Sequence, residues 1–252
     1  MLDEKKYLVG TGYGIRESAV AEMLARIYDF IWIDWEHTWL DRKDIFDGLV
    51  AVHSGGAPVV VRIPWNDPVL AKPILEMGPD GIVFPQIHSY EEAKAAIAAC
   101  TYPPDGIRGW GPGRAVWYGD IPAEQYIAEQ NERIFKILQV ENMGCVRDLD
   151  KILELKGVDC ICVGPMDLSA SVGHLARLRD AEVQRVYDQV GEIARRHDVP
   201  LMLSYGFSPE EIADWRDRGV RIFHINGDMG LVKNAAMYEI KEVRRIISEK
   251  EE

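Results

Sequence analysis

The sequence is poor in cysteine and lacks long apolar runs. Its four cysteines, among 252 residues, show no CxxC spacing; they are Cys100, Cys145, Cys160 and Cys162. A chain of this length can build a core without disulfide staples, so we expect reduced thiols and a cytoplasmic protein. No apolar signal region follows Met1, and no stretch reaches the ~20 apolar residues of a transmembrane helix, so we expect no membrane location.

Positive charge is also scarce. The 29 lysines and arginines are outnumbered by 41 aspartates and glutamates, which gives a formal net charge of −12. A surface of this sign repels phosphate backbones and anionic lipids, so we expect neither nucleic acid nor a membrane as partner. A small acidic substrate remains possible, but its pocket would then need local cations, either arginine or a metal ion.

What the sequence does contain is a regular alternation of short β-branched runs and longer amphipathic stretches. The eight strands that we expect span residues 6–11, 29–34, 58–63, 80–86, 134–140, 159–164, 200–204 and 221–226. No linker or low-complexity tract divides the chain. Eight such repeats in about 250 residues predict one α/β domain over residues 1–252, a single (β/α)8 TIM barrel. The amphipathic segment 231–248 could dock on a neighbouring subunit.

Polar side chains gather where the expected strands end. Active sites of TIM barrels lie at the C-terminal ends of the strands, where the loops that follow the strands meet. We therefore expect a shared site. Its candidate residues are Asp34, Glu36, His37, Arg62, Gln86, Gln139, Glu141 and Asp167.

Glu141 and Asp167 follow adjacent strands, so their carboxylates could meet over the barrel mouth. Two oxygen ligands with open positions suit Mg²⁺ or Mn²⁺, which fill their remaining sites with water and substrate oxygens. The alternative for Asp167 is a helix N-cap, because it follows a Gly-Pro turn and precedes a helical pattern.

Arg62 ends a buried apolar run and needs an anion to face. Its planar fork of donors suits a 2-keto acid, and the alternative is a structural salt bridge to Asp34 or Glu36. Asp34 lies three residues before His37, close enough to orient the imidazole as an acid/base pair. A purely structural histidine is the alternative.

Residues 101–120 form the longest stretch without either periodicity, and they are rich in Pro, Gly, Arg and Trp. Long irregular loops in compact domains usually have a function. We expect this segment, with Arg108 and Trp110, to be a loop over the site.

Five ordered motifs give the stretch from Phe30 to Ser171 a recognisable pattern. They are Ile33–His37, Val61–Asp67, Tyr102–Gly109, Gln139–Glu141 and Gly164–Ser169. In this order and spacing they resemble the HpcH/HpaI family of class II pyruvate aldolases. That family includes 4-hydroxy-2-oxoheptanedioate aldolase and 2-keto-3-deoxy sugar acid aldolases, and its fold is a barrel of the phosphoenolpyruvate/pyruvate-binding type.

The resemblance implies roles for most of the candidate residues. Glu141 and Asp167 would hold a divalent metal, Mg²⁺ or Mn²⁺ with Co²⁺ or Zn²⁺ as alternatives, and the metal would chelate pyruvate. Arg62 would stabilise the enolate oxygen, and His37 paired with Asp34 would transfer protons. Residues that would contribute to substrate binding are Gln139, Gly164, Pro165 and Met166. The resemblance also implies a homo-oligomer, a trimer or a hexamer.

The sequence departs from the family pattern at some positions. Relatives carry an aspartate that reaches a neighbouring subunit's site, whereas this chain has Glu76, followed by the rigid Pro79. Met166 replaces a small residue before the metal aspartate. Four tryptophans lie near the motifs and could favour a bulky aldehyde or pack against other subunits: Trp35, Trp39, Trp110 and Trp117.

The function that we expect is reversible cleavage of a 4-hydroxy-2-oxo acid to pyruvate and an aldehyde. The alternatives are an oxaloacetate decarboxylase or another pyruvate-enolate enzyme on the same site, or a catalytically silent barrel. A Schiff-base mechanism would need a lysine inside the barrel. The candidate is Lys136, which should point outward if Gln139 and Glu141 point inward.

Overall fold

The computed structural model describes residues 6–248, apart from the side chains of residues 130–132. Its eight parallel strands close into one barrel in sequence order, which confirms the predicted fold. The strands are β1 (Leu8–Tyr13), β2 (Phe30–Asp34), β3 (Val59–Arg62), β4 (Gly81–Phe84), β5 (Phe135–Val140), β6 (Cys160–Val163), β7 (Leu201–Tyr205) and β8 (Val220–Gly227). All eight predicted strands are present, with ends that differ by a residue or two.

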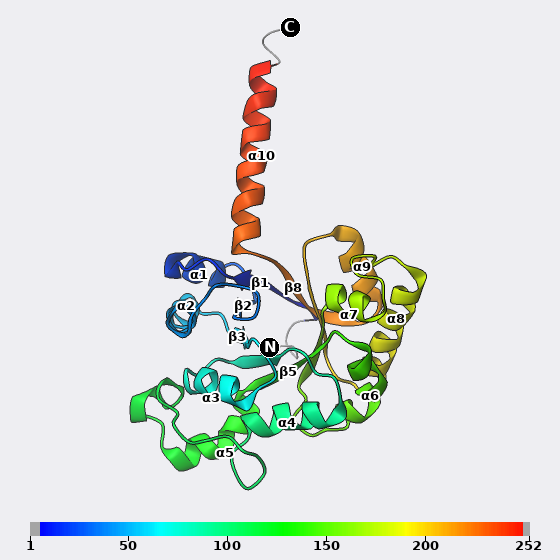
Figure 1. Cartoon of the computed structure of the whole chain (residues 1–252). Helices are drawn as coiled ribbons and strands as arrows, with labels where there is room; N and C mark the ends of the chain where they lie inside the picture. The colour runs from blue at the N-terminus through cyan, green and yellow to red at the C-terminus, as the bar shows by residue number, and fades with distance from the viewer. Residues whose placement is uncertain (1–5, 249–252) are drawn as a thin grey trace.

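Helices surround the strands in a ring (Figure 1). They are α1 (Ser18–Ala25), α2 (Arg42–Gly55), α3 (Pro68–Glu76), α4 (Tyr90–Cys100), the 3-10 helix η1 (Arg114–Gly119), α5 (Ala123–Arg133), α6 (Met143–Leu153), α7 (Pro165–Ser171), α8 (Ala181–Arg196), α9 (Pro209–Asp217) and α10 (Asp228–Ser248). Side-chain caps fix several starts: Ser89 accepts from the backbone N–H of Glu92, and Ser208 from that of Glu211. None of the described helices is both long and apolar enough to span a bilayer.

The barrel interior is filled by an apolar cluster from every strand. Its members are Leu8, Phe30, Trp32, Val60, Val83, Ile137, Cys160, Cys162, Met202 and Ile222. Gly10 leaves the space that the Phe30 ring occupies, since a Cβ there would lie 2.4 Å from it. Because side chains alternate along a strand, Arg62 after Val60 and Gln139 after Ile137 project into the layer above this cluster.

The same alternation turns Lys136 outward. Its ammonium is buried between the carboxylate of Asp159, at 2.9 Å, and the carbonyl of Ile134, at 2.8 Å. These contacts hold it at the start of β5, outside the barrel. The four cysteines are all buried free thiols.

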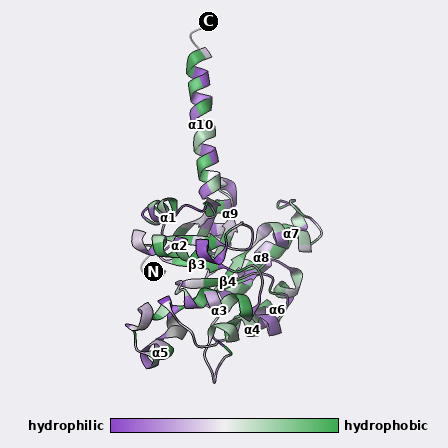
Figure 2. Ribbon diagram, turned by 60° about the vertical axis from the view of Figure 1, so that its left-hand side comes forward, coloured by the Kyte–Doolittle hydropathy of each residue, from purple (hydrophilic) through white to green (hydrophobic). Residues whose placement is uncertain are grey.

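Helix α10 leaves the end of β8 and projects away from the ring of helices (Figure 1). Only its first residue, Asp228, is buried. Hydrophobic and hydrophilic residues alternate along its length (Figure 2). The predicted C-terminal helix is therefore present, and it makes little contact with its own barrel.

Asp228 joins the start of α10 to the loop after β1. One oxygen accepts the backbone N–H groups of Gly14 and Ile15, each at 2.8 Å, and the other accepts that of Met229 at 2.8 Å. Three donors on one buried carboxylate fix the point where the barrel closes between β8 and β1.

Replacing this carboxylate should destabilise the closure. In Asp228→Ala, one buried and two partly buried N–H groups lose their acceptor, so we expect the free energy of unfolding to fall by about 2–4 kcal/mol. Chemical denaturation would measure the loss, with Asp217→Ala at the exposed end of α9 as control. Equal midpoints for the two variants would show that Asp228 does not hold this junction.

Candidate active site

Arg62 is the centre of the polar layer at the C-terminal ends of the strands. Its guanidinium donates to both oxygens of Asp34, from Nε at 2.9 Å and from a terminal nitrogen at 2.6 Å. The other terminal nitrogen lies 3.0 Å from a Glu36 oxygen and 3.5 Å from the amide oxygen of Gln139. Both salt bridges foreseen as alternatives for Arg62 are thus present. One buried cation links strands β2, β3 and β5.

Glu141 is held by one donor on each carboxylate oxygen. The side-chain amide of Gln139 donates to one oxygen at 2.5 Å, and the backbone N–H of Gln86 donates to the other at 2.5 Å. Gln86 adopts a left-handed conformation, with φ of 55°, to aim its N–H. Gly164 faces the pair, because a Cβ there would lie 2.9 Å from the Gln139 amide nitrogen.

The carboxyl groups of the site differ in acidity. Although burial opposes it, the hydrogen bonds and charge of Arg62 hold the pKa of Asp34 below its ordinary value. Burial raises the pKa of Glu36 to about 7, and the neighbouring Asp34 and Asp167 add to the rise. Burial also raises the pKa of Glu141 to about 7, with Glu36 and Asp167 adding to it. Three acidic groups therefore repel one another at the mouth.

Asp167 lies in the first turn of α7 and is exposed. The N-cap of this helix is Gly164, and no side chain caps it. The capping alternative for Asp167 is therefore wrong, since the helix begins before it, at Pro165. Asp167 adds its charge to the field at Glu36 and Glu141.

Comparison with known proteins places the chain in a family. The model of the HpcH/HpaI aldolase/citrate lyase family matches residues 14–235. The chain belongs to the HpcH/HpaI family. It is similar to the hydroxypyruvate/pyruvate aldolase of Roseovarius nubinhibens, with 32% identity over 94% of this chain and 92% of that protein.

Two further similarities extend the comparison. The 4-hydroxy-2-oxo-heptane-1,7-dioate aldolase of Shigella sonnei is 35% identical over 72% of this chain and 70% of its own. The crystal structure of an HpcH/HpaI aldolase/citrate lyase family protein from Burkholderia cenocepacia superposes with a TM-score of 0.87, at 29% identity and 95% coverage of each chain.

The donor set of this HpcH/HpaI chain fits an open oxygen site. Among residues 6–248, no three acidic, histidine or cysteine side chains form a ready metal cage. Mg²⁺ commonly takes one or two protein carboxylates and completes its shell with water and substrate oxygens. Glu141 and Asp167 supply two carboxylates, and the Glu36 carboxylate, ion-paired with Arg62, lies beside them. A cation would relieve the repulsion among these groups.

His37 differs from its predicted geometry. Its imidazole lies 3.7 Å from a Glu36 oxygen, and its side chain is 63% exposed. Asp34 accepts the backbone N–H of His37 at 3.4 Å, but its oxygens are committed to Arg62. The expected imidazole–Asp34 pair is therefore wrong in this structure, because the arginine outcompetes the imidazole for the carboxylate.

The segment 101–120 does not cover this chain's own site, so that expectation is wrong. A connection from a helix to the next strand lies at the N-terminal end of the barrel. Arg108 is buried there and donates to the Leu75 carbonyl and to the Tyr126 hydroxyl. Trp110 packs near Tyr126, with ring centroids 6.4 Å apart, and is 53% exposed.

Glu76 lies at the same end of the barrel as this segment. It ends α3, and a Cβ on Gly111 would lie 2.6 Å from its carboxylate. A role for Glu76 at a neighbouring subunit's site stays a prediction. Trp117, in η1, also lies at this end, where Arg114 stacks on it and donates to the Met77 carbonyl. It therefore does not line the chain's own mouth.

Ser204 and His224 are two polar residues of the barrel mouth that were not predicted from the sequence. They pair across β7 and β8, and the Ser204 hydroxyl lies 2.8 Å from the His224 Nδ1. The imidazole stacks on Trp32 with ring centroids 4.7 Å apart and planes 7° apart. The sequence did contain a signal for this position: His224 lies two residues after Ile222 on an expected strand, so the two side chains share the face that points into the barrel.

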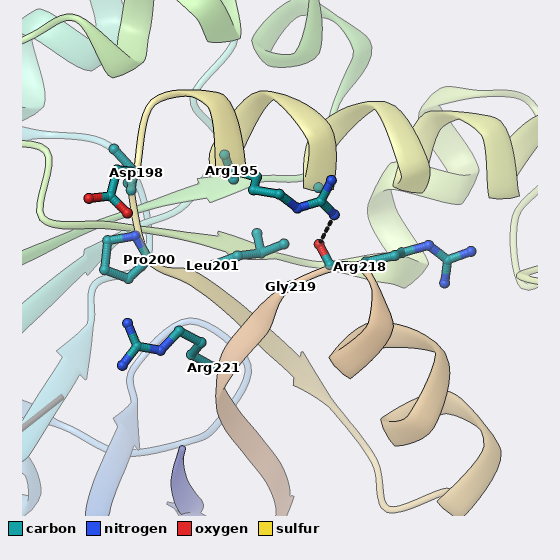
Figure 3. A pocket seen from close by; sticks show the side chains of 10 residues that line it. Arg195, Asp198, Pro200, Leu201, Arg218, Gly219 and Arg221 are labelled. Carbon is teal, nitrogen blue, oxygen red and sulfur yellow. Dashed lines mark hydrogen bonds between the residues drawn. The ribbon is translucent and has the colours of Figure 1, made fainter. Parts of the chain in front are cut away.

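A pocket of about 130 Å³ lies at the opposite end of the barrel, by the starts of β7 and β8. Arg195, Arg218 and Arg221 line it, but their guanidinium groups point in different directions (Figure 3). Arg195 donates to the Arg218 carbonyl, and Arg218 donates to Asp188. The pocket therefore does not form an anion site.

The raised pKa values predict how a cation affects stability. A carboxyl whose pKa rises on folding stabilises the fold while protonated, and this contribution is lost as pH rises from about 4.5 through about 7. We expect the melting temperature of the metal-free protein to fall between pH 5.5 and 8. Added Mg²⁺ or Mn²⁺ should raise it more at pH 8, by roughly 2–8 °C.

Glu141→Gln should flatten both the pH dependence and the response to metal, whereas Glu192→Gln, on the exposed face of α8, should keep them. Differential scanning calorimetry at the two pH values measures each effect. An equal metal shift in wild type and Glu141→Gln would place the cation elsewhere.

Proposed function

We propose that this HpcH/HpaI chain is a divalent-metal-dependent aldolase. It reversibly cleaves a 4-hydroxy-2-oxo acid to pyruvate and an aldehyde. The observation that supports this most is the buried Arg62, fixed by Asp34 and directed at the carboxylate layer that holds Glu141. The names of the relatives from Roseovarius nubinhibens and Shigella sonnei support the same reaction class.

The metal site is proposed at Glu141 and Asp167, with Mg²⁺ or Mn²⁺ as the cation. A cation bound there would act as a Lewis acid toward the keto group of the substrate. Gln139 and the Gln86 N–H hold the Glu141 carboxylate in one orientation, so its remaining lone pairs face the mouth. In the first turn of α7, at Gly164, Pro165 and Met166, the backbone N–H of Met166 would bind the substrate carboxylate, because Pro165 has no N–H and that of Gly164 is donated to the Val140 carbonyl.

Arg62 would stabilise the charge that develops during cleavage. When the C3–C4 bond breaks, its electron pair moves toward the keto oxygen, and the proton of the 4-hydroxyl leaves. A guanidinium already fixed by Asp34 needs no reorganisation to face that oxygen, which is the source of electrostatic catalysis. In the next step C3 gains a proton and pyruvate forms.

Glu36 and His37 would carry the protons. The pKa of Glu36 is raised to about 7, in the range that suits general acid–base transfer near neutral pH. The His37 imidazole, 3.7 Å from Glu36 and largely exposed, would connect it to solvent. A Schiff base finds no support here, since Lys136 lies outside the barrel beside Asp159.

We also propose that the protein is a homo-oligomer, a trimer or a hexamer, in which α10 packs on a second copy. Val232, Ile240, Val243 and Ile247 recur at helical spacing along α10 and are each about half exposed or more. An apolar stripe of this length is unusual on a monomer and marks an interaction surface.

The proposed reaction predicts exchange of the pyruvate methyl protons for deuterium. With Mg²⁺ or Mn²⁺ in D₂O, NMR should show loss of the methyl signal, because enolate formation needs no aldehyde. EDTA or Glu141→Gln should slow exchange by at least ~100-fold, while Glu192→Gln should exchange as wild type does. No exchange with any divalent cation would reject the pyruvate aldolase and favour oxaloacetate decarboxylation or a silent barrel.

If α10 packs on a second copy, charged side chains placed on its apolar stripe should weaken the oligomer. Ile240→Glu combined with Val243→Glu would bury two carboxylates in the contact, so we expect a shift to lower mass in light scattering. Lys241→Glu, on the opposite side of the helix, should leave the mass unchanged. A wild-type mass equal to that of one chain would contradict the proposal.

A further inference from the structure

A cavity of about 540 Å³ lies at the N-terminal end of the barrel, beside the starts of β3, β4 and β5. Pro58, Asp80 and Ile134 line it, and each immediately precedes one of these strands. Arg62 and Gln139 lie toward the other ends of β3 and β5. The cavity is therefore separate from the proposed active site, and its volume is in the range of small-molecule sites.

Arg114, at the start of η1, is the buried cation of this cavity. The residue is 9% exposed, and its guanidinium donates to the Met77 carbonyl at 3.0 Å and to Nδ1 of His53 at 2.9 Å. Within the part of the chain that the structure describes, Arg114 has no ion pair with a carboxylate. Burial lowers its pKa, and the charge of Asp80 offsets only part of that effect. A guanidinium carries five N–H groups, so these two contacts leave donors for a ligand.

The contact with Arg114 makes His53 a neutral acceptor. A guanidinium only donates, so Nδ1 of His53 accepts and the ring proton lies on Nε2. Nε2 then donates to the Asp80 carboxylate at 2.8 Å, and the same Asp80 oxygen accepts the backbone N–H of Val59 at 2.8 Å. The charge of Asp80 is thus directed at His53 and Val59, and the charge of Arg114 is left without a direct counter-ion.

Trp117 provides an aromatic wall beside this cation. The Arg114 guanidinium lies 5.3 Å from the centroid of the indole, and Trp117 is 56% exposed. Trp117 and Tyr118 both have left-handed backbones, with φ of 49° and 56°. Such conformations are costly for residues other than glycine and persist only where the surrounding structure holds them. The turn therefore keeps a large apolar surface exposed next to a buried positive charge.

The remaining walls limit the class of ligand. Much of the surface is apolar and comes from Ala57, Pro79, Ala115 and Ile134. Arg133, which also lines the cavity, is paired with Glu129 and so adds little net charge. A monoanion would neutralise Arg114, whereas a dianion such as phosphate would also be repelled by Asp80. The apolar walls and the indole favour a flat, apolar body on that anion.

We propose that this cavity is a second ligand site, which binds an aromatic carboxylate that carries a single negative charge. Arg114 pairs with the carboxylate through its remaining N–H groups, and the ring of the ligand lies against Trp117. Because the site is at the end of the barrel opposite to the mouth, its binding does not depend on the proposed metal or on the aldolase reaction.

Benzoate is the probe, and ligand-observed NMR titration of the full chain measures its Kd. EDTA in every sample prevents the carboxylate from binding through a metal ion at the mouth. Benzamide has the same shape without the charge, and inorganic phosphate has charge without the ring. We expect benzoate to bind at least ~10-fold more tightly than either compound, because only benzoate uses both the guanidinium and the indole.

Two variants and a matched control locate the bound probe. Arg114→Gln removes the charge and should raise the Kd of benzoate at least ~10-fold. Trp117→Ala changes an exposed side chain, so the fold should persist while the Kd rises about fivefold. Trp65→Ala, at a similarly exposed tryptophan in the loop after β3, should bind benzoate as wild type does.

Three results would overturn this proposal and leave the aldolase function untouched. They are an unchanged Kd in Trp117→Ala, phosphate or benzamide binding as tightly as benzoate, and no benzoate binding to the wild type at roughly 10 mM. The aldolase function is instead tested by pyruvate deuterium exchange, which needs the metal that EDTA removes here.

Discussion

The bidentate contact between Arg62 and Asp34 is the interaction on which the rest of the site depends. A guanidinium that is only 8% exposed needs a paired anion, and Asp34 on the adjacent strand supplies it through both oxygens. The pair fixes β2 against β3 at the mouth. It also leaves one guanidinium nitrogen for Glu36 and Gln139, and Gln139 in turn orients Glu141. A single cation thus sets the positions of groups from three strands.

The barrel can bury this network because its interior is divided into layers. Apolar side chains fill the interior below, and polar residues follow them at the next inward position of β2, β3, β5, β7 and β8. Trp32 joins the layers, since its ring contacts both the Arg62 guanidinium and the His224 imidazole. The polar layer is therefore placed by strand alternation and closed on one side by a rigid aromatic surface.

Much of this arrangement could be predicted from the sequence. Strand ends placed Arg62, Gln139 and Glu141 at the mouth, and with Gln139 and Glu141 inside, alternation placed Lys136 outside, because the period of a strand is fixed by its geometry. The salt bridge between Arg62 and Asp34 was foreseen only as an alternative, because spacing along the chain could not decide whether Asp34 would bind this arginine, 28 residues away, or the imidazole of His37. The position of segment 101–120 did follow from topology, because a connection that precedes a strand lies at the barrel's N-terminal end.

The acidic field of the mouth links stability and metal binding. Burial raises the pKa of Glu36 and of Glu141 to about 7, so each carboxylate is costly to ionise without a counter-charge. Arg62 offsets part of that cost, and a divalent cation would offset more. The negative charge that remains lies beside the position proposed for the oxo acid. Across the mouth, the neutral pair of Ser204 and His224 supplies hydrogen bonding without charge. The repulsion that weakens the metal-free protein is therefore the same repulsion that a bound cation would relieve.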